Sequence, residues 1–303
     1  MPVLLILAAG ILWGCTGLFV RTLSAFGFYP GELVFIKMLV SLIVLAAGIF
    51  LKDRNQLKIH LRDIWIFFGS GVCSAALFNY YYFNTIILTS LSVAAVLLYT
   101  APVFVMLLSA WLFHEALTIR KAAAIASVLI GCICVTGVLT GSGALPPKGI
   151  AMGLLAGFGY ALYSIFSRIA LNKGYSANTI TVYTFFFTSF CFFFLIDRIH
   201  LTTRLQTVTP QNIIIILALS LFVNLIPFVC YTNGLKRMET GKAVVIVSIE
   251  PAAAAFLGIL CYHEQITLTV ILGILLVIGS IVLINTGPAM RQASPPAPVA
   301  EKD

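Results

Sequence analysis

Two charged side chains stand inside long apolar runs of this sequence. Glu250 interrupts the run VSIEPAAAAF, and Lys37 interrupts GELVFIKMLVSLIVL. A charge in the middle of a hydrocarbon layer costs roughly 2.5–3.5 kcal/mol on insertion scales, so such residues face a cavity or a partner and not lipid. Three kinds of chemistry suit the Glu250 carboxylate: proton coupling, a counter-charge for a cationic ligand group, or an ion pair with Lys37. For Lys37, extension of its ammonium to the nearby membrane interface, pairing with Glu32, and a ligand contact are all open.

Two prolines lie inside apolar runs in a comparable way. Pro251 follows Glu250 directly, and Pro102 occupies the middle of LLYTAPVFVMLL. A proline inside a helix removes one backbone donor and leaves the carbonyl one turn earlier without a partner, here that of Val247 or Leu98. We therefore expect Pro102 and Pro251 to be helix hinges that present polar backbone to a cavity.

Amide and aromatic side chains recur at helical spacing. Asn79 and Tyr82 are three residues apart, and Asn224 and Tyr231 are seven apart, so each pair shares one helix face. Amides and hydroxyls in hydrocarbon need partners, which turns these faces toward the interior. Hydrogen bonding between helices would explain any one of them equally well. The candidate substrate-binding residues are Trp13, Asn79, Tyr82, Tyr99, Tyr160, Tyr163, Asn224, Tyr231 and Glu250, with Lys37 as their candidate charge partner.

The dipeptide His-Glu ends two of the apolar runs, at residues 114–115 and 263–264. It resembles part of a zinc-binding helix motif, but the second histidine four positions later is missing, and Thr118 and Thr267 stand there. We therefore expect no metal site and no cofactor. The two glutamates are expected to cap the following helix or to latch a gate.

The amino-acid composition indicates that most of the protein surface faces lipid and not water. Hydrophobic residues make up 61% of the 303 positions and charged residues 9%, with a mean hydropathy of +1.08, so most of the surface has to face lipid. Runs such as SLIVLAAGIF lack the alternation of membrane β-strands. We predict an all-α integral membrane protein with ten transmembrane helices. The predicted spans are 3–20, 33–51, 64–84, 92–113, 121–139, 148–168, 178–196, 211–233, 242–262 and 267–285.

The net charge of +8 reports orientation and not nucleic-acid binding. With the N-terminus in the cytoplasm, 13 of the 18 Lys and Arg residues fall on the cytoplasmic side, four on the other side, and Lys37 within a span. This positive-inside bias places both termini in the cytoplasm of a multi-pass protein of the cell membrane, the inner membrane in a bacterium. The longest internal loops, 52–63 and 197–210, are too short to house a nucleotide, and no nucleotide-binding motif occurs.

An internal repeat divides the chain. The segment LLYTAPVFVMLLSAWLFHEALT matches IVSIEPAAAAFLGILCYHEQIT at an offset of 149, and AAGILWGCTGLFVR parallels LAGFGYALYSIFSR at an offset of 147. Each half holds five predicted helices, and because five is odd the second half enters the membrane from the opposite side. We expect repeats at 1–140 and 146–286, inverted around a central cavity, followed by a mobile cytoplasmic tail at 287–303.

These features together resemble the EamA family of the drug/metabolite transporter superfamily. The resemblance is carried by the two halves, by a fourth helix in each with a central proline and an acidic end, and by Trp13, Gly14 and Gly17 of the first helix. The second half departs from the pattern at Tyr160-Ala161. The resemblance implies a membrane exporter of amino acids and related metabolites.

The sequence thus favours a secondary transporter and not an enzyme, because no catalytic signature occurs. The expected partners are the lipid bilayer, a small-molecule substrate, most readily an amino acid with an apolar or aromatic side chain, and protons as a candidate coupling ion. No nucleic acid is expected. A carrier of sugars, nucleotides or drugs is the alternative on the same scaffold, and a channel or an intramembrane enzyme is the alternative of another class.

Overall fold

The computed structural model describes residues 2–89, 91–136, 146–262 and 267–286, and their regular structure is entirely helical. The helices of the first half are α1 (Pro2–Gly14), α2 (Thr16–Ala25), α3 (Pro30–Lys52), α4 (Ile64–Phe68), α5 (Leu77–Leu88), α6 (Leu91–Leu98), α7 (Ala101–Phe113) and α8 (Ile119–Thr136). Those of the second half are α9 (Pro147–Asn172), α10 (Ala177–Leu195), α11 (Arg198–Gln206), α12 (Pro210–Ala218), α13 (Ile226–Leu235), α14 (Thr240–Val247), α15 (Glu250–Tyr262) and α16 (Leu268–Asn285).

Nine helical stretches of the described residues are long and apolar enough to cross a membrane. They confirm the all-α membrane fold. The remaining predicted span, 121–139, corresponds to α8, which ends at Thr136 where the described residues stop. The total of ten spans therefore stays a prediction.

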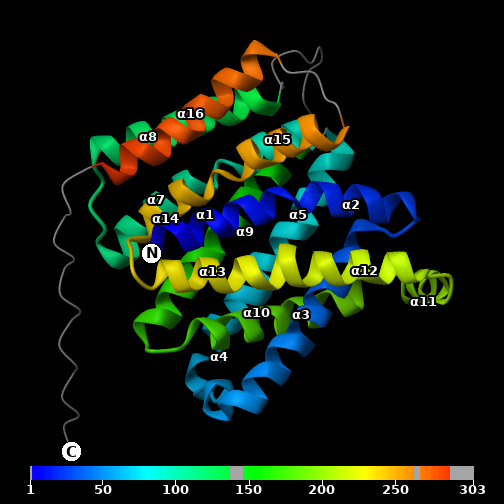
Figure 1. Ribbon diagram of the computed structural model, residues 1–303. Helices are drawn as coiled ribbons and strands as arrows, with labels where there is room; N and C mark the ends of the chain where they lie inside the picture. The colour runs from blue at the N-terminus through cyan, green and yellow to red at the C-terminus, as the bar shows by residue number, and fades with distance from the viewer. Residues whose placement is uncertain (1, 90, 137–145, 263–266, 287–303) are drawn as a thin grey trace, which may run out of the picture.

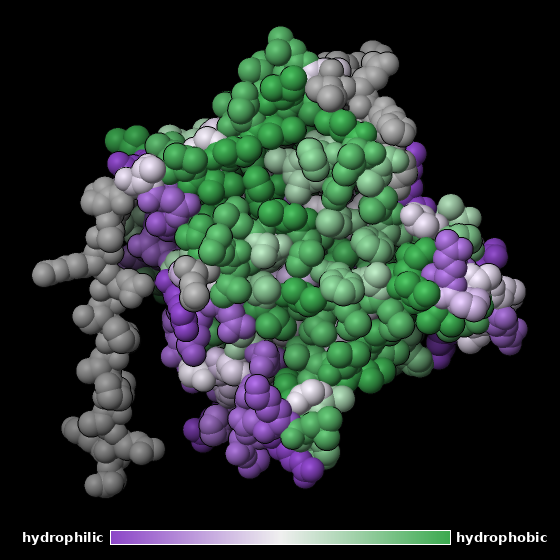
Figure 2. Space-filling view, viewed as in Figure 1, coloured by the Kyte–Doolittle hydropathy of each residue, from purple (hydrophilic) through white to green (hydrophobic). Residues whose placement is uncertain are grey.

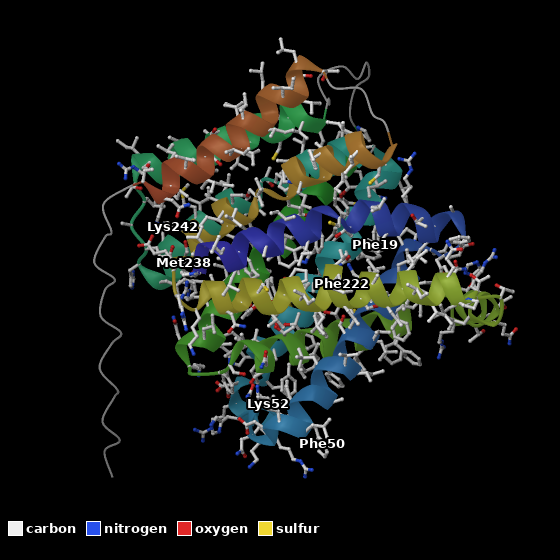
Figure 3. All side chains as sticks on the ribbon, viewed as in Figure 1. Phe19, Phe50, Lys52, Phe222, Met238 and Lys242 are labelled. Carbon is white, nitrogen blue, oxygen red and sulfur yellow. The ribbon has the colours of Figure 1, made fainter. Side chains whose placement is uncertain are left out.

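The surface between the two ends of the bundle is apolar. Figure 2 shows hydrophobic side chains over the middle of one face, with hydrophilic ones over α11 on one side and over the ends of α13 and α14 on the other. Phe50 and Phe222, labelled in Figure 3, are about half exposed, at 50% and 56%. A continuous apolar surface of this kind is what a hydrocarbon environment favours.

Helices of one half pack mainly on helices of the other half (Figure 1). In the first half, α1 contacts α13, α14 and α15; in the second, α9 contacts α5, α6 and α7. The pairs α3 with α10 and α8 with α16 join equivalent members of the two halves. This exchange of partners is what two related halves would produce, and their opposite orientation stays a prediction.

Corresponding helices are interrupted at corresponding places. Between α6 and α7 the chain turns at residues 99–100, and between α14 and α15 it turns at 248–249. Pro102 and Pro251 are the second residues of the helices that follow, where a missing backbone donor costs nothing. Two π-helical segments, Gly69–Ala76 and Leu219–Leu225, interrupt the third membrane crossing of each half. Segments of this kind are often found at functional sites.

The predicted loop at 197–210 is partly wrong, because it contains α11. The Asp197 carboxylate accepts hydrogen bonds from the backbone of Ile199 and His200 at 3.0 and 3.1 Å, which caps the helix. Leu201 is buried against the cluster that includes Leu23 and Phe28. The loop at 52–63 contains two 3-10 turns, Arg54–Leu57 and Leu61–Asp63. The predicted tail at 287–303 and the second His-Glu pair lie outside the described residues.

Candidate functional site

A cavity of about 550 Å³ lies between the two halves. Its lining reaches Val20, Pro30 and Val270 at the end of the bundle that carries α11, which we call the α11 end. Toward the opposite end the lining includes Tyr163 and Tyr231 but stops before the ends of their helices. Among the described residues, the cavity lining thus reaches the α11 end of the bundle and stops short of the opposite end.

Most of the residues predicted from sequence meet in this cavity. It is lined by Trp13, Lys37, Asn79, Tyr82, Tyr99, Tyr160, Tyr163, Asn224, Tyr231, Glu250 and Pro251. Pro102 is different: it is buried at the start of α7 and does not line the cavity, because Leu98 and Tyr99 form the wall before that helix. Whether these residues bind a ligand stays a prediction.

The predicted set omitted other residues of the cavity lining, among them Ser74, Phe78 and Phe228. Ser74 and Phe78 precede Tyr82 at four-residue spacing, and Phe228 lies on the same face as Asn224 and Tyr231. Helical spacing would have found two of them, because Phe78 lies one turn before Tyr82 and Phe228 lies between Asn224 and Tyr231 on the face that they share. Ser74 has a buried hydroxyl with no hydrogen-bond partner among the described residues, and no sequence pattern marks it.

Aromatic rings from α1, α9 and α13 form one wall of the cavity. The Trp13 ring lies 5.3 Å from that of Phe228, 5.6 Å from Tyr231 and 6.4 Å from Tyr160, between centroids. The Tyr163 hydroxyl is 2.7 Å from that of Thr232, and the Tyr231 hydroxyl is 2.7 Å from that of Ser164. Because the Tyr163 and Tyr231 hydroxyls have these partners, the two side chains offer the cavity mainly their rings.

The two amides of the site are anchored by their nitrogens. Asn79 Nδ2 donates to the Ala75 carbonyl at 2.7 Å, and Asn224 Nδ2 donates to Ser41 Oγ at 3.0 Å. No hydrogen bond within the described part of the chain reaches either amide oxygen. The amide oxygens are therefore available as acceptors.

Glu250 and Lys37 reach the cavity from different halves. Glu250 is the first residue of α15, where the positive end of the helix dipole favours a carboxylate. The Tyr160 hydroxyl donates to Glu250 Oε2 at 3.4 Å. No ion pair within 4.0 Å joins Lys37 to Glu250, and Glu32, another candidate partner of Lys37, instead contacts His200 Nδ1 at 2.7 Å. Lys37 thus contributes a positive charge to the cavity wall.

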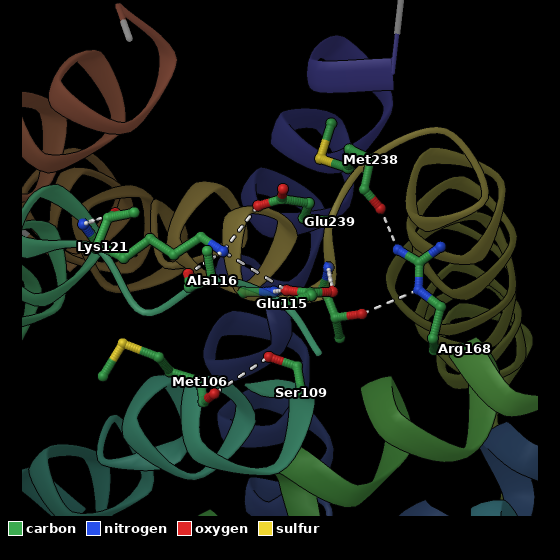
Figure 4. A network of polar contacts seen from close by, with 11 residues as sticks. Met106, Ser109, Glu115, Ala116, Lys121, Arg168, Met238 and Glu239 are labelled. Atoms are coloured by element: carbon green, nitrogen blue, oxygen red, sulfur yellow. Dashed lines mark hydrogen bonds and ion pairs between the residues drawn. The ribbon is translucent and has the colours of Figure 1, made fainter. Parts of the chain in front are cut away.

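Polar contacts close the end of the bundle opposite α11 (Figure 4). We call Glu115, Lys121, Arg168, Glu239 and Thr240 the latch, and this end the latch end. Glu115 accepts hydrogen bonds from the backbone N–H groups of Thr240 and Gly241 at 2.6 and 3.0 Å, so its carboxylate occupies the start of α14. The first of the two predicted acidic helix ends therefore joins the halves.

Two cations complete the latch. Lys121 Nζ lies 2.8 Å from Glu239 Oε2 and 3.8 Å from Glu115 Oε2, and it donates to the Ala116 carbonyl at 3.0 Å. Arg168 Nε donates to Thr240 Oγ1 at 2.9 Å, and Arg168 Nη2 donates to the Met238 carbonyl. His114, just before Glu115, has a left-handed backbone (φ 54°) that turns the chain after α7.

Comparison with known proteins agrees with this arrangement. The family model described as EamA-like transporter family matches residues 1–137 and 147–286. An uncharacterized transporter of Clostridium kluyveri is 27% identical over 264 residues, which cover 84% of this chain and 83% of that protein. An uncharacterized transporter of Archaeoglobus fulgidus is 27% identical over 215 residues, covering 69% of this chain and 73% of that protein. One crystal structure shares the fold with a TM-score of 0.75 and 18% identity, over 94% of this chain and 96% of the other.

Proposed function

Because the chain belongs to the EamA-like transporter family, we propose that this membrane transporter is a secondary carrier of amino acids with apolar or aromatic side chains. It moves them outward across the cell membrane by alternating access, with both of its termini in the cytoplasm. The observation that carries this proposal is a cavity that combines an aromatic wall with the Glu250 carboxylate.

The cavity suits a solute of this size and character. Its volume of about 550 Å³ is within the range of roughly 300–1,000 Å³ that is typical of small-molecule sites. The rings of Trp13, Phe228 and Tyr231 would contact an apolar side chain. Glu250 would neutralise the ammonium group, which is the simplest reason for a carboxylate at this depth.

Alternating access is supported by the difference between the two ends. The cavity reaches the α11 end, while the latch joins the halves at the opposite end. Inverted halves would allow the reverse arrangement, with the breaks before Pro102 and Pro251 as hinges. Protons are the candidate coupling ion, and Glu250 is the residue that would carry them.

Counterflow in proteoliposomes tests the proposal. Vesicles containing the full chain are loaded with unlabelled L-phenylalanine, L-leucine, glucose or uridine, and uptake of the labelled solute is followed. We expect saturable uptake, stimulated by internal substrate, for the amino acids alone. Uptake of glucose or uridine with no response to any amino acid in a full panel would overturn the amino-acid assignment, and flux without saturation would indicate a channel.

A further inference from the structure

We propose that Lys37 and Glu250 together recognise the two ends of a zwitterion, with Lys37 binding the carboxylate and Glu250 the ammonium group. The inference rests on the proposed transport of amino acids and specifies how that site selects them. Its ligand class is a solute that carries both an ammonium and a carboxylate group on neighbouring atoms.

The first support is the placement of the two charges. Lys37 belongs to α3 of the first half and Glu250 to α15 of the second, yet both line the same cavity. No ion pair within 4.0 Å joins these two described residues, and the only hydrogen bond to the Glu250 carboxylate within the described part of the chain comes from Tyr160. Two opposite charges that share a cavity without direct contact leave space for a ligand that bridges them.

The second support is the unused bonding capacity of both groups. Glu250 receives one hydrogen bond, from Tyr160 to Oε2, at the long distance of 3.4 Å. Lys37 has three donors on Nζ. In the described part of the chain, no contact within hydrogen-bond distance uses any of these donors or the second Glu250 oxygen. Both residues are partly buried on the cavity wall, so their unused donors and acceptor are open to a ligand that enters the cavity.

The third support is the chemistry of a singly charged ligand. An amine would satisfy Glu250 and leave Lys37 without a partner, and a carboxylic acid would do the opposite. A charge that a bound ligand shields from water without pairing it is costly, and sites built on polar contacts reject analogues that lack one of them far more strongly than sites built on apolar contacts. A zwitterion neutralises both groups at once.

Different residues of the cavity would bind the side chain and the polar groups of the solute. Trp13, Tyr163 and Tyr231 offer rings to a side chain, as described above. Tyr82 and Tyr99 also line the cavity, and their hydroxyls form no hydrogen bond with other described residues. We expect these hydroxyls and the Asn79 and Asn224 amide oxygens to bind the remaining donors and acceptors of the solute.

The test compares three probes that share one side chain. L-phenylalanine carries both charges, phenethylamine carries only the ammonium, and 3-phenylpropionate carries only the carboxylate. Binding of each to the full chain in detergent is measured by calorimetry for the wild type, Lys37→Gln and Glu250→Gln. The conservative variants Lys37→Arg and Glu250→Asp test retention of charge, and Lys52→Gln, an exposed lysine of the same helix, is the matched control.

We expect the wild type to bind L-phenylalanine at least tenfold more tightly than either analogue. Lys37→Gln should lower the preference over phenethylamine at least tenfold, and Glu250→Gln should lower the preference over 3-phenylpropionate by a similar factor. Lys37→Arg and Glu250→Asp, which keep the charges, should retain a preference for L-phenylalanine over both analogues, and Lys52→Gln should bind all three probes as the wild type does. Elution and thermal unfolding like those of the wild type establish that each variant is folded.

The outcomes separate the two proposals. If amino acids are transported but Lys37→Gln leaves the preference over phenethylamine intact, the zwitterion inference is wrong and the proposed function stands. If Lys37→Gln fails to fold while folded Lys37→Arg shows no preference for L-phenylalanine over phenethylamine, the inference is also wrong. If the wild type transports no amino acid and binds none of the three probes, both proposals are wrong.

Discussion

The Glu32 carboxylate has one partner that is close in sequence, Tyr29, and one that is distant, His200. Glu32 is 1% exposed, its Oε1 lies 2.7 Å from His200 Nδ1, and its Oε2 accepts from the Tyr29 backbone at 2.8 Å. The Tyr29 ring stacks on His200 with 4.0 Å between centroids. These contacts attach α11 to the start of α3, next to Pro30 and Leu33 of the cavity wall.

Removing the imidazole should therefore destabilise the protein. His200→Ala leaves one carboxylate oxygen of Glu32 buried without its partner, a change that costs about 1–3 kcal/mol of unfolding free energy. His60→Ala is the matched control, because the His60 side chain is exposed and the hydrogen bonds of this residue to Tyr175 and Asp63 use its backbone N–H and carbonyl, which the substitution keeps. Unfolding in detergent measures both. Equal stability of the two variants would show that the contact with Glu32 is unimportant.

The contacts of Glu32 also show which features of single residues can be predicted from the sequence. Glu32 and Lys37 are five positions apart, which on a helix of 3.6 residues per turn places them on different faces, so nearness in the chain was a poor guide to pairing. The cavity-facing positions of Glu250, Asn79 and Asn224 could be predicted, because burial of polar groups in lipid restricts them to the interior. The partner of Glu32 could not be predicted, since it lies 168 residues away.

At the scale of elements, helices of the two halves cross closely at glycine residues. A Cβ at Gly10 of α1 would lie 2.6 Å from Ile249 Cγ2 and 2.7 Å from the Val247 carbonyl oxygen. In the other half, a Cβ at Gly157 of α9 would lie 2.9 Å from the Leu97 carbonyl oxygen and 3.2 Å from that of Leu98. In both halves the first long helix thus packs against the backbone at the break in a helix of the other half.

Adding one methyl group at this crossing should be costly. Gly10→Ala pushes α1 away from the break between α14 and α15, and overpacking of this kind costs about 1–3 kcal/mol. Gly48→Ala in α3 has no atom within 4 Å of its new Cβ and should be neutral or stabilising by up to about 1 kcal/mol, through helix propensity. Thermal unfolding compares them. A Gly10→Ala variant as stable as Gly48→Ala would show that the crossing tolerates separation.

The elements themselves were largely predictable, and their interruptions were not. Apolar length identifies membrane helices because every backbone group in hydrocarbon has to be bonded within the segment. The prolines also indicated the breaks at 99–100 and 248–249. The π-helical segment at 219–225 contains no proline or glycine that would have indicated it. The helix α11 is too polar and too short to be distinguished from a loop by its sequence.

At the scale of the whole molecule, the two ends of the bundle differ. At the latch end, Glu115 and Lys121 have side chains only 10% and 7% exposed and join α14 to the first half. At the α11 end, the cavity lining reaches the helix ends. In the proposed alternating-access cycle, the latch has to break when the protein opens in the other direction, so its contacts would set the balance between the two states.

Weakening the latch should favour the state in which the latch end is open and the α11 end is closed. Lys121→Met removes the contacts with Glu239 and Glu115, and a change of about 1–3 kcal/mol alters the ratio of states roughly 5- to 150-fold. We expect amide hydrogen exchange in α14 to speed up at least fivefold, because the Thr240 and Gly241 N–H groups lose their acceptor when the latch opens, while exchange in α2 slows as the α11 end closes. Lys236→Met, an exposed lysine at the same end, is the control. Faster exchange in α14 with no change in α2 would indicate local fraying and would contradict coupled opening and closing of the two ends.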